Sequence, residues 1–186
     1  PYAYYRATST VFTWLFSLPL RQVSILTAWL PTAIASALIV ILVYPLTAPY
    51  SRLWGLLSIA LLLLSSTFIS ETRSVSLDQM LAAIALAVFY LGYAHDHFGA
   101  GKRLHWLYLL LIVGFAVRGP IGLVIPTGVL CSYYLINRQW RQLFSFGLLA
   151  LALLVACVGL LLLMAKLSGG EPFMQDVIRM QFLGRM

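Results

Sequence analysis

Long uncharged stretches, separated by a few charged residues, are the dominant pattern along the chain. A helix needs about 20 residues, with a usual range of roughly 17–25, to cross a bilayer core of about 30 Å, and most of these stretches have that length. They are apolar on every side, as in the run LALLVACVGLLLLMA, without the alternation of a strand. The pattern predicts an all-α, polytopic transmembrane bundle with about six spanning helices, at about 23–44, 53–70, 79–95, 104–117, 120–137 and 142–165.

The two ends of the chain have a different pattern. The segment at about 3–18 is short and rich in aromatic residues, which is typical of a helix that lies along the membrane interface. Near the other end, Gly169 and Gly170 are expected to end the last span, before an amphipathic interfacial helix at about 171–183. No repeat or low-complexity linker divides residues 1–186, so we expect a single transmembrane domain.

The composition supports a lipid environment. Hydrophobic residues make up 62% of the chain and charged residues 9%, and the mean hydropathy is +0.95. A soluble domain carries roughly 45–50% apolar and about 25% charged residues. Cys131 and Cys157 lie within apolar runs, which favours small core residues over a disulfide. The net charge of +7 requires no nucleic acid as a partner, because basic loops beside anionic membrane lipids account for much of it.

The distribution of basic residues predicts the orientation in the membrane. With the amino end outside, the cytoplasmic loops are 45–52, 96–103 and 138–141. These loops hold several Lys and Arg residues against one acid, Asp96, whereas the opposite loops near 71–78 and 118 hold basic residues balanced by acids. The positive-inside rule therefore places those opposite loops, and the stretch 167–186, on the extracytoplasmic face.

Two interpretations account for the polar residues of loop 71–78. Ser76 or Asp78 suits the N-cap of the following helix, where a side chain accepts hydrogen bonds from free N–H groups, and Arg73 and Glu71 can pair within the loop. Alternatively, an acid and an arginine at one membrane face bind a polar headgroup or a phosphate. The sequence leaves both interpretations open for Asp78.

Arg118 is expected below the outer surface of the membrane. Only the short uncharged stretch 104–117, about 20 Å of helix, separates it from Arg103. A charge at that depth usually faces a cavity or a partner. Pro120 suits the first turn of the next helix, whose free N–H groups favour an anion, so Arg118 marks a candidate anion site. The alternative is a tight helical hairpin in which Arg118 extends up to the interface.

The inferred cytoplasmic side carries His95, Asp96 and His97, with His105 nearby. Residues two apart on a helix point in different directions, so a solvated loop is favoured over a metal site. The sequence contains no nucleophile triad, phosphate-binding glycine loop or zinc pattern of Cys and His.

Three motifs and the amino-terminal segment, taken in their order along the chain, resemble segments of a known protein family. Arg73 stands five residues before Asp78 in TRSVSLD, and Arg118 opens the turn Arg-Gly-Pro-Ile-Gly, which an apolar run and Pro126 follow. The chain ends in GEPFMQDVIRMQFLGRM and begins with PYAYYRATSTVFTW. In this order the segments resemble the polytopic glycosyltransferases of the dolichyl-phosphate-mannose protein mannosyltransferase superfamily. The resemblance is nearest to the bacterial branch that includes the lipid A aminoarabinose transferases.

The resemblance implies a GT-C fold and a polyprenyl-phosphate-linked sugar as donor. Transfer to a lipid A-like or protein acceptor would occur on the extracytoplasmic face of a bacterial inner membrane. The acidic catalytic residue of the family lies in an outer loop upstream of the match to Pro1, so no catalytic residue is expected within this chain. The chain starts at Pro1 without an initiator Met or a signal sequence, and we expect it to be an internal piece of a longer membrane protein.

The resemblance also implies a donor-binding site. Its expected residues are Arg73, Asp78, Arg118, Gly119, Arg185 and Tyr4. The arginines would neutralise the phosphate of the leaving lipid, and Asp78 would orient them or a sugar hydroxyl. Arg118 replaces the usual lysine of the family, which keeps the charge and changes its geometry. Gln181 and Met186 stand where many relatives have His and Phe, so the metal of some relatives is not expected here.

A transporter or lipid flippase is the competing function, because broken helices with intramembrane charge also mark substrate paths. It predicts inverted-repeat halves, and the sequence shows only one short hairpin near the outer face. A non-catalytic membrane subunit is a third possibility that the residues leave open.

Overall fold

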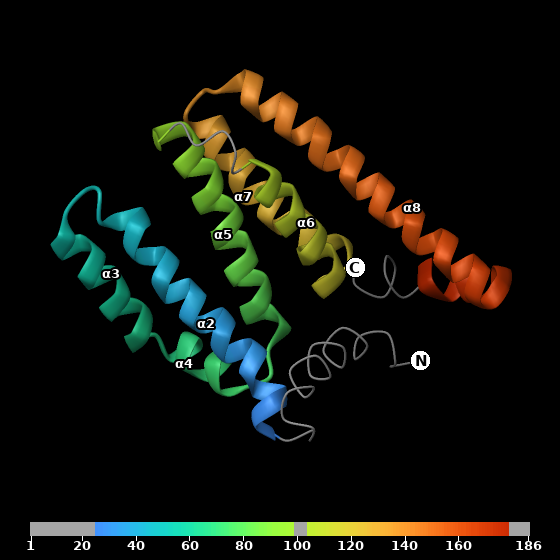
Figure 1. Ribbon diagram of the computed structural model, residues 1–186, viewed down its shortest axis with the longest axis horizontal. Coiled ribbons are helices and arrows are strands. Elements are labelled where there is room, and N and C mark those ends of the chain that lie inside the picture. The colour runs from blue at the N-terminus through green and yellow to red at the C-terminus, as the bar shows by residue number, and fades with distance from the viewer. Residues whose placement is uncertain (1–24, 99–103, 179–186) are drawn as a thin grey trace.

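The computed structural model describes residues 25–98 and 104–178, and every regular element in them is an α-helix. The all-α fold class expected from the hydrophobic pattern is therefore confirmed. The helices form an antiparallel bundle in which neighbours in sequence are neighbours in space (Figure 1). They are α2 (Ile25–Thr47), α3 (Arg52–Leu64), α4 (Ser66–Arg73), α5 (Leu77–Phe98), α6 (Leu104–Arg118), α7 (Pro120–Ile136) and α8 (Trp140–Ile178).

Helix α5 is the centre of the bundle, since it packs against α2, α6 and α7. The larger core cluster lies between α5, α6, α7 and α8, around the fully buried Val88, Leu111 and Leu130. A smaller cluster joins α5 to α2, around Ala35 and Ile39. The outward faces of α3 and α8 carry exposed leucines, as expected for helices that meet lipid.

The span expected at 53–70 is divided into two helices. Helices α3 and α4 meet at Ser65 with a bend of 63°. The Ser65 side chain accepts a hydrogen bond from the backbone N–H of Phe68, and its own N–H donates to the carbonyl of Leu62. A serine that satisfies backbone groups locally in this way ends one helix and begins the next. The hydrophobicity of the segment gives no sign of this break.

The connection between α6 and α7 is the tight helical hairpin that the sequence left as one alternative. Gly119 is the only residue between the two helices, and its φ of 66° and ψ of −148° lie in a region that side chains rarely adopt. Pro120 follows as the first residue of α7. An N–H group at this position would have no intrahelical hydrogen-bond partner, so proline, which has none, fits here. Close to the turn, Gly114 and Gly122 face each other so closely that a Cβ on either would collide with the carbonyl oxygen of the other.

Length and composition together identify three helices in the described ranges as candidate spans, within α2, α5 and α8. The bent pair α3–α4 makes a fourth if it counts as one span, and α6 and α7 are shorter apolar helices. These elements correspond in order to the six expected spans, whose number stays a prediction.

One of the two expected interfacial helices differs from the structure, and the other lies outside the described residues. Helix α8 continues to Ile178 without the end expected at Gly169 and Gly170. The expected helix at about 171–183 is therefore part of α8 as far as Ile178, and its remainder lies outside the described residues. The expected helix at about 3–18 also lies outside them.

Candidate functional site

A buried polar network joins three helices at the end of the bundle where α2 and α5 begin. Thr32, Ser36, Ser76 and Gln79 are all buried there, next to the mainly apolar core of the described helices. The Gln79 Nε2 donates to the Ser36 hydroxyl over 3.0 Å, and the Ser36 hydroxyl donates to the Thr32 carbonyl over 2.9 Å. The Ser36 hydroxyl also lies 3.1 Å from that of Thr72 on α4. Because buried polar groups are stable only when they are paired, this network fixes α2 and α5 relative to α4.

The same network holds the turn between α4 and α5. The backbone N–H of Ser76 donates to the Thr32 hydroxyl over 3.2 Å, and the Trp29 indole N–H donates to the Thr72 carbonyl over 2.6 Å. The Ser76 hydroxyl in turn accepts from the backbone N–H of Gln79 over 3.3 Å, so Ser76 is the N-cap of α5. The capping role that the sequence left open between Ser76 and Asp78 belongs to Ser76.

Asp78 is instead one half of an ion pair. Its carboxylate contacts the guanidinium of Arg118, which is the last residue of α6. The carboxylate side chain is 64% exposed and the arginine 32% exposed, so the pair lies at the surface of this end of the bundle. Among the expected site residues, the structure brings these two together with Gly119, the neighbour of Arg118.

The backbone around the pair favours both charges. Asp78 lies in the first turn of α5, where the helix dipole favours an acid, and Arg118 lies in the last turn of α6, where it favours a cation. Arg118 is also next to the start of α7, where the cap, Gly119, offers no side chain, Pro120 has no N–H, and the N–H of Gly122 donates to the Gly119 carbonyl. The starts of α5 and α7 and one guanidinium are therefore close together here, and the dipoles of the two helices and the charge of Arg118 favour an anion.

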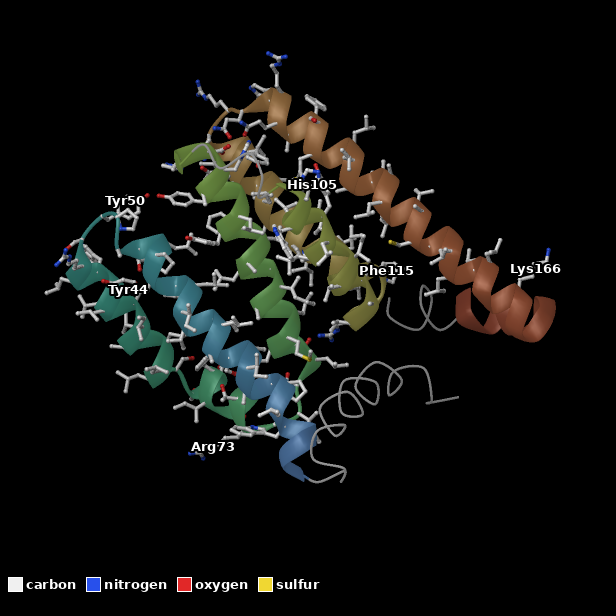
Figure 2. All side chains as sticks on the ribbon, in the orientation of Figure 1. Tyr44, Tyr50, Arg73, His105, Phe115 and Lys166 are labelled. Atoms are coloured by element: carbon white, nitrogen blue, oxygen red, sulfur yellow. The ribbon has the colours of Figure 1, made fainter. Side chains whose placement is uncertain are left out.

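Arg73 is at the same end of the bundle but outside this pair. It is the last residue of α4 and is exposed, and its side chain points away from the bundle (Figure 2). Within the described ranges the structure records no ion pair between Arg73 and Glu71. The local pairing considered for these two residues is therefore not observed. Tyr4 and Arg185 of the expected site lie outside the described residues.

The opposite end of the bundle departs from the expected solvated loop. His95, Asp96 and His97 belong to the last turns of α5, and the ring of His97 stacks on that of Tyr93. The carboxylate oxygens of Asp96 and the Nδ1 atom of His95 are buried without a hydrogen-bond partner in the described part of the chain. No group of three potential metal-binding side chains occurs in that part of the chain.

Sequence reasoning missed the network that supports Asp78. Thr32 and Ser36 are four residues apart, and an α-helix places such residues on one face. Two hydroxyl residues at that spacing inside an apolar span could have indicated a buried polar contact on that face of the helix. Gln79 is the other polar residue of the first turn of α5, and it points inward where Asp78 points outward.

Comparison with known proteins covers most of the chain. The family model described as dolichyl-phosphate-mannose-protein mannosyltransferase matches residues 8–166. That range contains the Asp78–Arg118 pair, Arg73 and the whole buried network.

A curated relative from Pseudomonas aeruginosa (strain UCBPP-PA14) is 34% identical over 140 residues. It is described as an undecaprenyl phosphate-alpha-4-amino-4-deoxy-L-arabinose arabinosyl transferase. The match covers 68% of this chain and 24% of the relative, so the chain spans about a quarter of the length of that protein. No solved structure matches the chain.

Proposed function

Because the chain belongs to the dolichyl-phosphate-mannose-protein mannosyltransferase family, we propose that it is part of a membrane glycosyltransferase. The protein transfers a sugar from a polyprenyl-phosphate-linked donor to an acceptor on the extracytoplasmic face. The curated relative is described as acting with an undecaprenyl-phosphate-linked aminoarabinose, which supports a lipid-linked donor. The proposed acceptor is lipid A-like, as the resemblance implies. A protein is the other acceptor that the family description allows. The proposed location is a bacterial inner membrane.

The observation that carries the proposal is the Asp78–Arg118 pair at the helical hairpin. Transfer breaks the bond between the anomeric carbon of the sugar and a phosphate oxygen, so negative charge grows on the departing polyprenyl phosphate. A guanidinium stabilises that charge, and it can engage a carboxylate and a phosphate through different edges of its planar fork. Arg118 is therefore assigned to the donor phosphate.

Asp78 has two tasks in this site. Its contact restrains the Arg118 side chain, which reduces the conformational entropy lost when the phosphate binds. Its exposed carboxylate also accepts a hydrogen bond from a hydroxyl or amine of the donor sugar. Gly119 lets the backbone approach the phosphate closely, because it has no Cβ. Arg185 and Tyr4 are further proposed members of the site, and Arg73, whose side chain points away from the bundle, would have to turn toward the pair to join them. The base that activates the acceptor comes from elsewhere in the full-length protein.

Replacement of Arg118 tests this assignment in the full-length protein. Arg118→Ala is expected to lower sugar transfer from a polyprenyl phosphate donor by about 100-fold or more, as for the loss of one donor that stabilises a growing negative charge. Arg118→Lys keeps the charge that the family usually places here but lacks the planar fork, and is expected to transfer sugar faster than Arg118→Ala and more slowly than wild type.

Arg141→Ala is the matched control, because Arg141 is an exposed arginine at the start of α8, at the other end of the bundle. It is expected to transfer sugar at the wild-type rate. Wild-type activity of Arg118→Ala would remove Arg118 from the donor site.

A lipid flippase is the second candidate, and the 63° bend between α3 and α4 is the observation that favours it, because broken helices are a feature of transporters. In transporters, broken helices that mark a substrate path carry an intramembrane charge. The residue at this break, Ser65, is uncharged, and it satisfies the backbone groups of the bend by hydrogen bonds. Translocation of a fluorescent polyprenyl phosphate across proteoliposomes that lack acceptor and show no sugar transfer would favour the flippase over the transferase.

A further inference from the structure

The start of α5 is attached to α2 at two points. Thr32 and Ser36 are four residues apart and lie on one face of α2, which packs against α5 (Figure 1). The Thr32 hydroxyl accepts from the backbone N–H of Ser76 over 3.2 Å, and the Ser36 hydroxyl accepts from the Gln79 Nε2 over 3.0 Å. All four residues are more than nine-tenths buried, so water does not compete for these hydrogen bonds.

The two points of attachment lie on either side of Asp78 in the sequence. Ser76 and Gln79 are three residues apart and both bond to α2. Asp78 lies between them and, at about 100° of rotation per residue, projects from another side of the turn, where it contacts Arg118. Two attachments on one face fix the rotation of this turn about the helix axis. They therefore determine where the Asp78 carboxylate lies relative to the end of α6.

The ion pair alone holds the turn only weakly. The side chain of Asp78 is 64% exposed and that of Arg118 is 32% exposed. Water and salt screen charges at such exposure, and both side chains lose entropy when they keep one geometry, so surface ion pairs contribute little to stability. Breaking a buried hydrogen bond costs more, because the group left behind has neither a partner nor water. The geometry of the pair therefore depends on the uncharged network that faces α2.

We propose that Thr32 is a positioning residue of the donor site, because its hydroxyl holds the backbone of Ser76 and thereby places Asp78 against Arg118. Ser36 acts in the same way through the side chain of Gln79. Neither residue has to touch the donor. The effect on sugar transfer rests on the proposed function, whereas the effect on the position of Asp78 does not.

Cross-linking measures this position without turnover. In the full-length protein without native cysteines, Asp78→Cys and Arg118→Cys are joined by a short bifunctional methanethiosulfonate, and the rate of cross-linking reports how close the two positions lie. The two substitutions also remove the ion pair, so a dependence on Thr32 belongs to the network. Thr32→Val keeps the branched shape and removes the hydroxyl, and it is expected to slow cross-linking severalfold. Thr32→Ser keeps the hydroxyl and is expected to restore the original rate.

Thr127→Val is the matched control. Thr127 is a threonine within α7 whose hydroxyl is buried without a hydrogen-bond partner in the described helices, so its removal is expected to leave the rate unchanged. Gln79→Met releases the second point of attachment at nearly constant side-chain length, and it is expected to slow cross-linking as Thr32→Val does. It decides the question by the same comparison if Thr32→Val gives no folded protein.

Sugar transfer is measured with Asp78 and Arg118 in place and is expressed per folded protein, which removes the effect of lower stability. Thr32→Val is expected to lower kcat by about tenfold, because a shift of about 1 Å in a positioned group can cost about 100-fold and a smaller shift is expected here. Thr32→Ser is expected to retain most of the wild-type kcat.

Equal cross-linking rates for Thr32→Val and Thr127→Val would overturn the proposal. Slowing by Thr32→Ser as large as by Thr32→Val would also overturn it, because the hydroxyl would then not be the cause. The two proposals fail separately. Cross-linking that depends on Thr32 in a protein that transfers no sugar contradicts the proposed function alone, and sugar transfer with cross-linking independent of Thr32 contradicts the positioning role alone.

Discussion

Single hydroxyl groups decide which way the residues at the start of α5 point. Ser76 caps the helix, so Asp78 is free of that role and contacts Arg118 instead. Gln79, the next residue, turns inward to the Ser36 hydroxyl. Ser36 is therefore the residue through which α2, α4 and α5 are connected, since its hydroxyl contacts groups of all three helices.

Loss of the Ser36 hydroxyl is expected to destabilise the protein. Ser36→Ala leaves the buried Gln79 amide without its acceptor, and an unsatisfied buried polar group costs about 1–3 kcal/mol. The measurement is the midpoint of thermal unfolding in detergent, which is expected to fall. Ser132→Ala is the control, because Ser132 is exposed and its hydroxyl bonds only to the Gly128 carbonyl of its own helix. Equal midpoints for the two variants would contradict a role for the network in stability.

At the scale of helices, the α6–α7 hairpin places Arg118. The close approach of Gly114 and Gly122 allows the two helices to meet near their connection, and Gly119 turns the chain in a single residue. Small residues that let helix backbones approach closely are typical of packing within membranes. The sequence favoured a short connection because Pro120 follows Gly119, but the contact between the other two glycines appears only in the structure.

A methyl group at this contact is expected to force the two helices apart. Gly122→Ala places a Cβ against the carbonyl of Gly114, and overpacking of this kind destabilises by about 1–3 kcal/mol. Thermal unfolding of this variant is expected at a lower temperature, together with weaker donor binding, because Arg118 moves with α6. Gly128→Ala lies on the same helix, with open space around its added Cβ, and is expected to be as stable as wild type or more so. A stable, fully active Gly122→Ala variant would show that the close approach is dispensable.

At the scale of the whole molecule, the two ends of the bundle carry different charged residues. Asp78, Arg118 and Arg73 lie at one end, and Asp96 lies at the other, in the last turns of α5. The positive-inside rule predicts that the first end is extracytoplasmic. That orientation is a property of the membrane-inserted protein, and labelling from one side of the membrane tests it.

Two exposed positions allow this labelling. In a background without Cys131 and Cys157, Val75→Cys lies on the turn before α5 and Ile136→Cys lies at the end of α7, with native side chains that are 57% and 80% exposed. A membrane-impermeant maleimide added to spheroplasts is expected to react with Val75→Cys, and with Ile136→Cys only after permeabilisation. The reverse pattern would invert the topology and place the proposed donor site in the cytoplasm.

The sequence alone was sufficient for the class of protein and much of its architecture. The all-α fold and the family followed from hydrophobic length and the order of weak motifs, and both are shown. The hairpin around Gly119 was one of two alternatives that the turn residues left open. These features are local, because the lipid solvent imposes its demand for apolar side chains and paired backbone groups on each segment separately.

The tertiary structure decided which polar residues meet. Asp78 and Arg118 belong to different helices, and their contact depends on the crossing of α6 and α7 and on the packing of α5 against both. The break at Ser65 was equally invisible, because a serine is tolerated within an apolar helix until its side chain caps a new one. Hydrophobicity determines that a segment enters the bilayer, but only side-chain packing determines which face it turns to its neighbour and therefore which charges form the site.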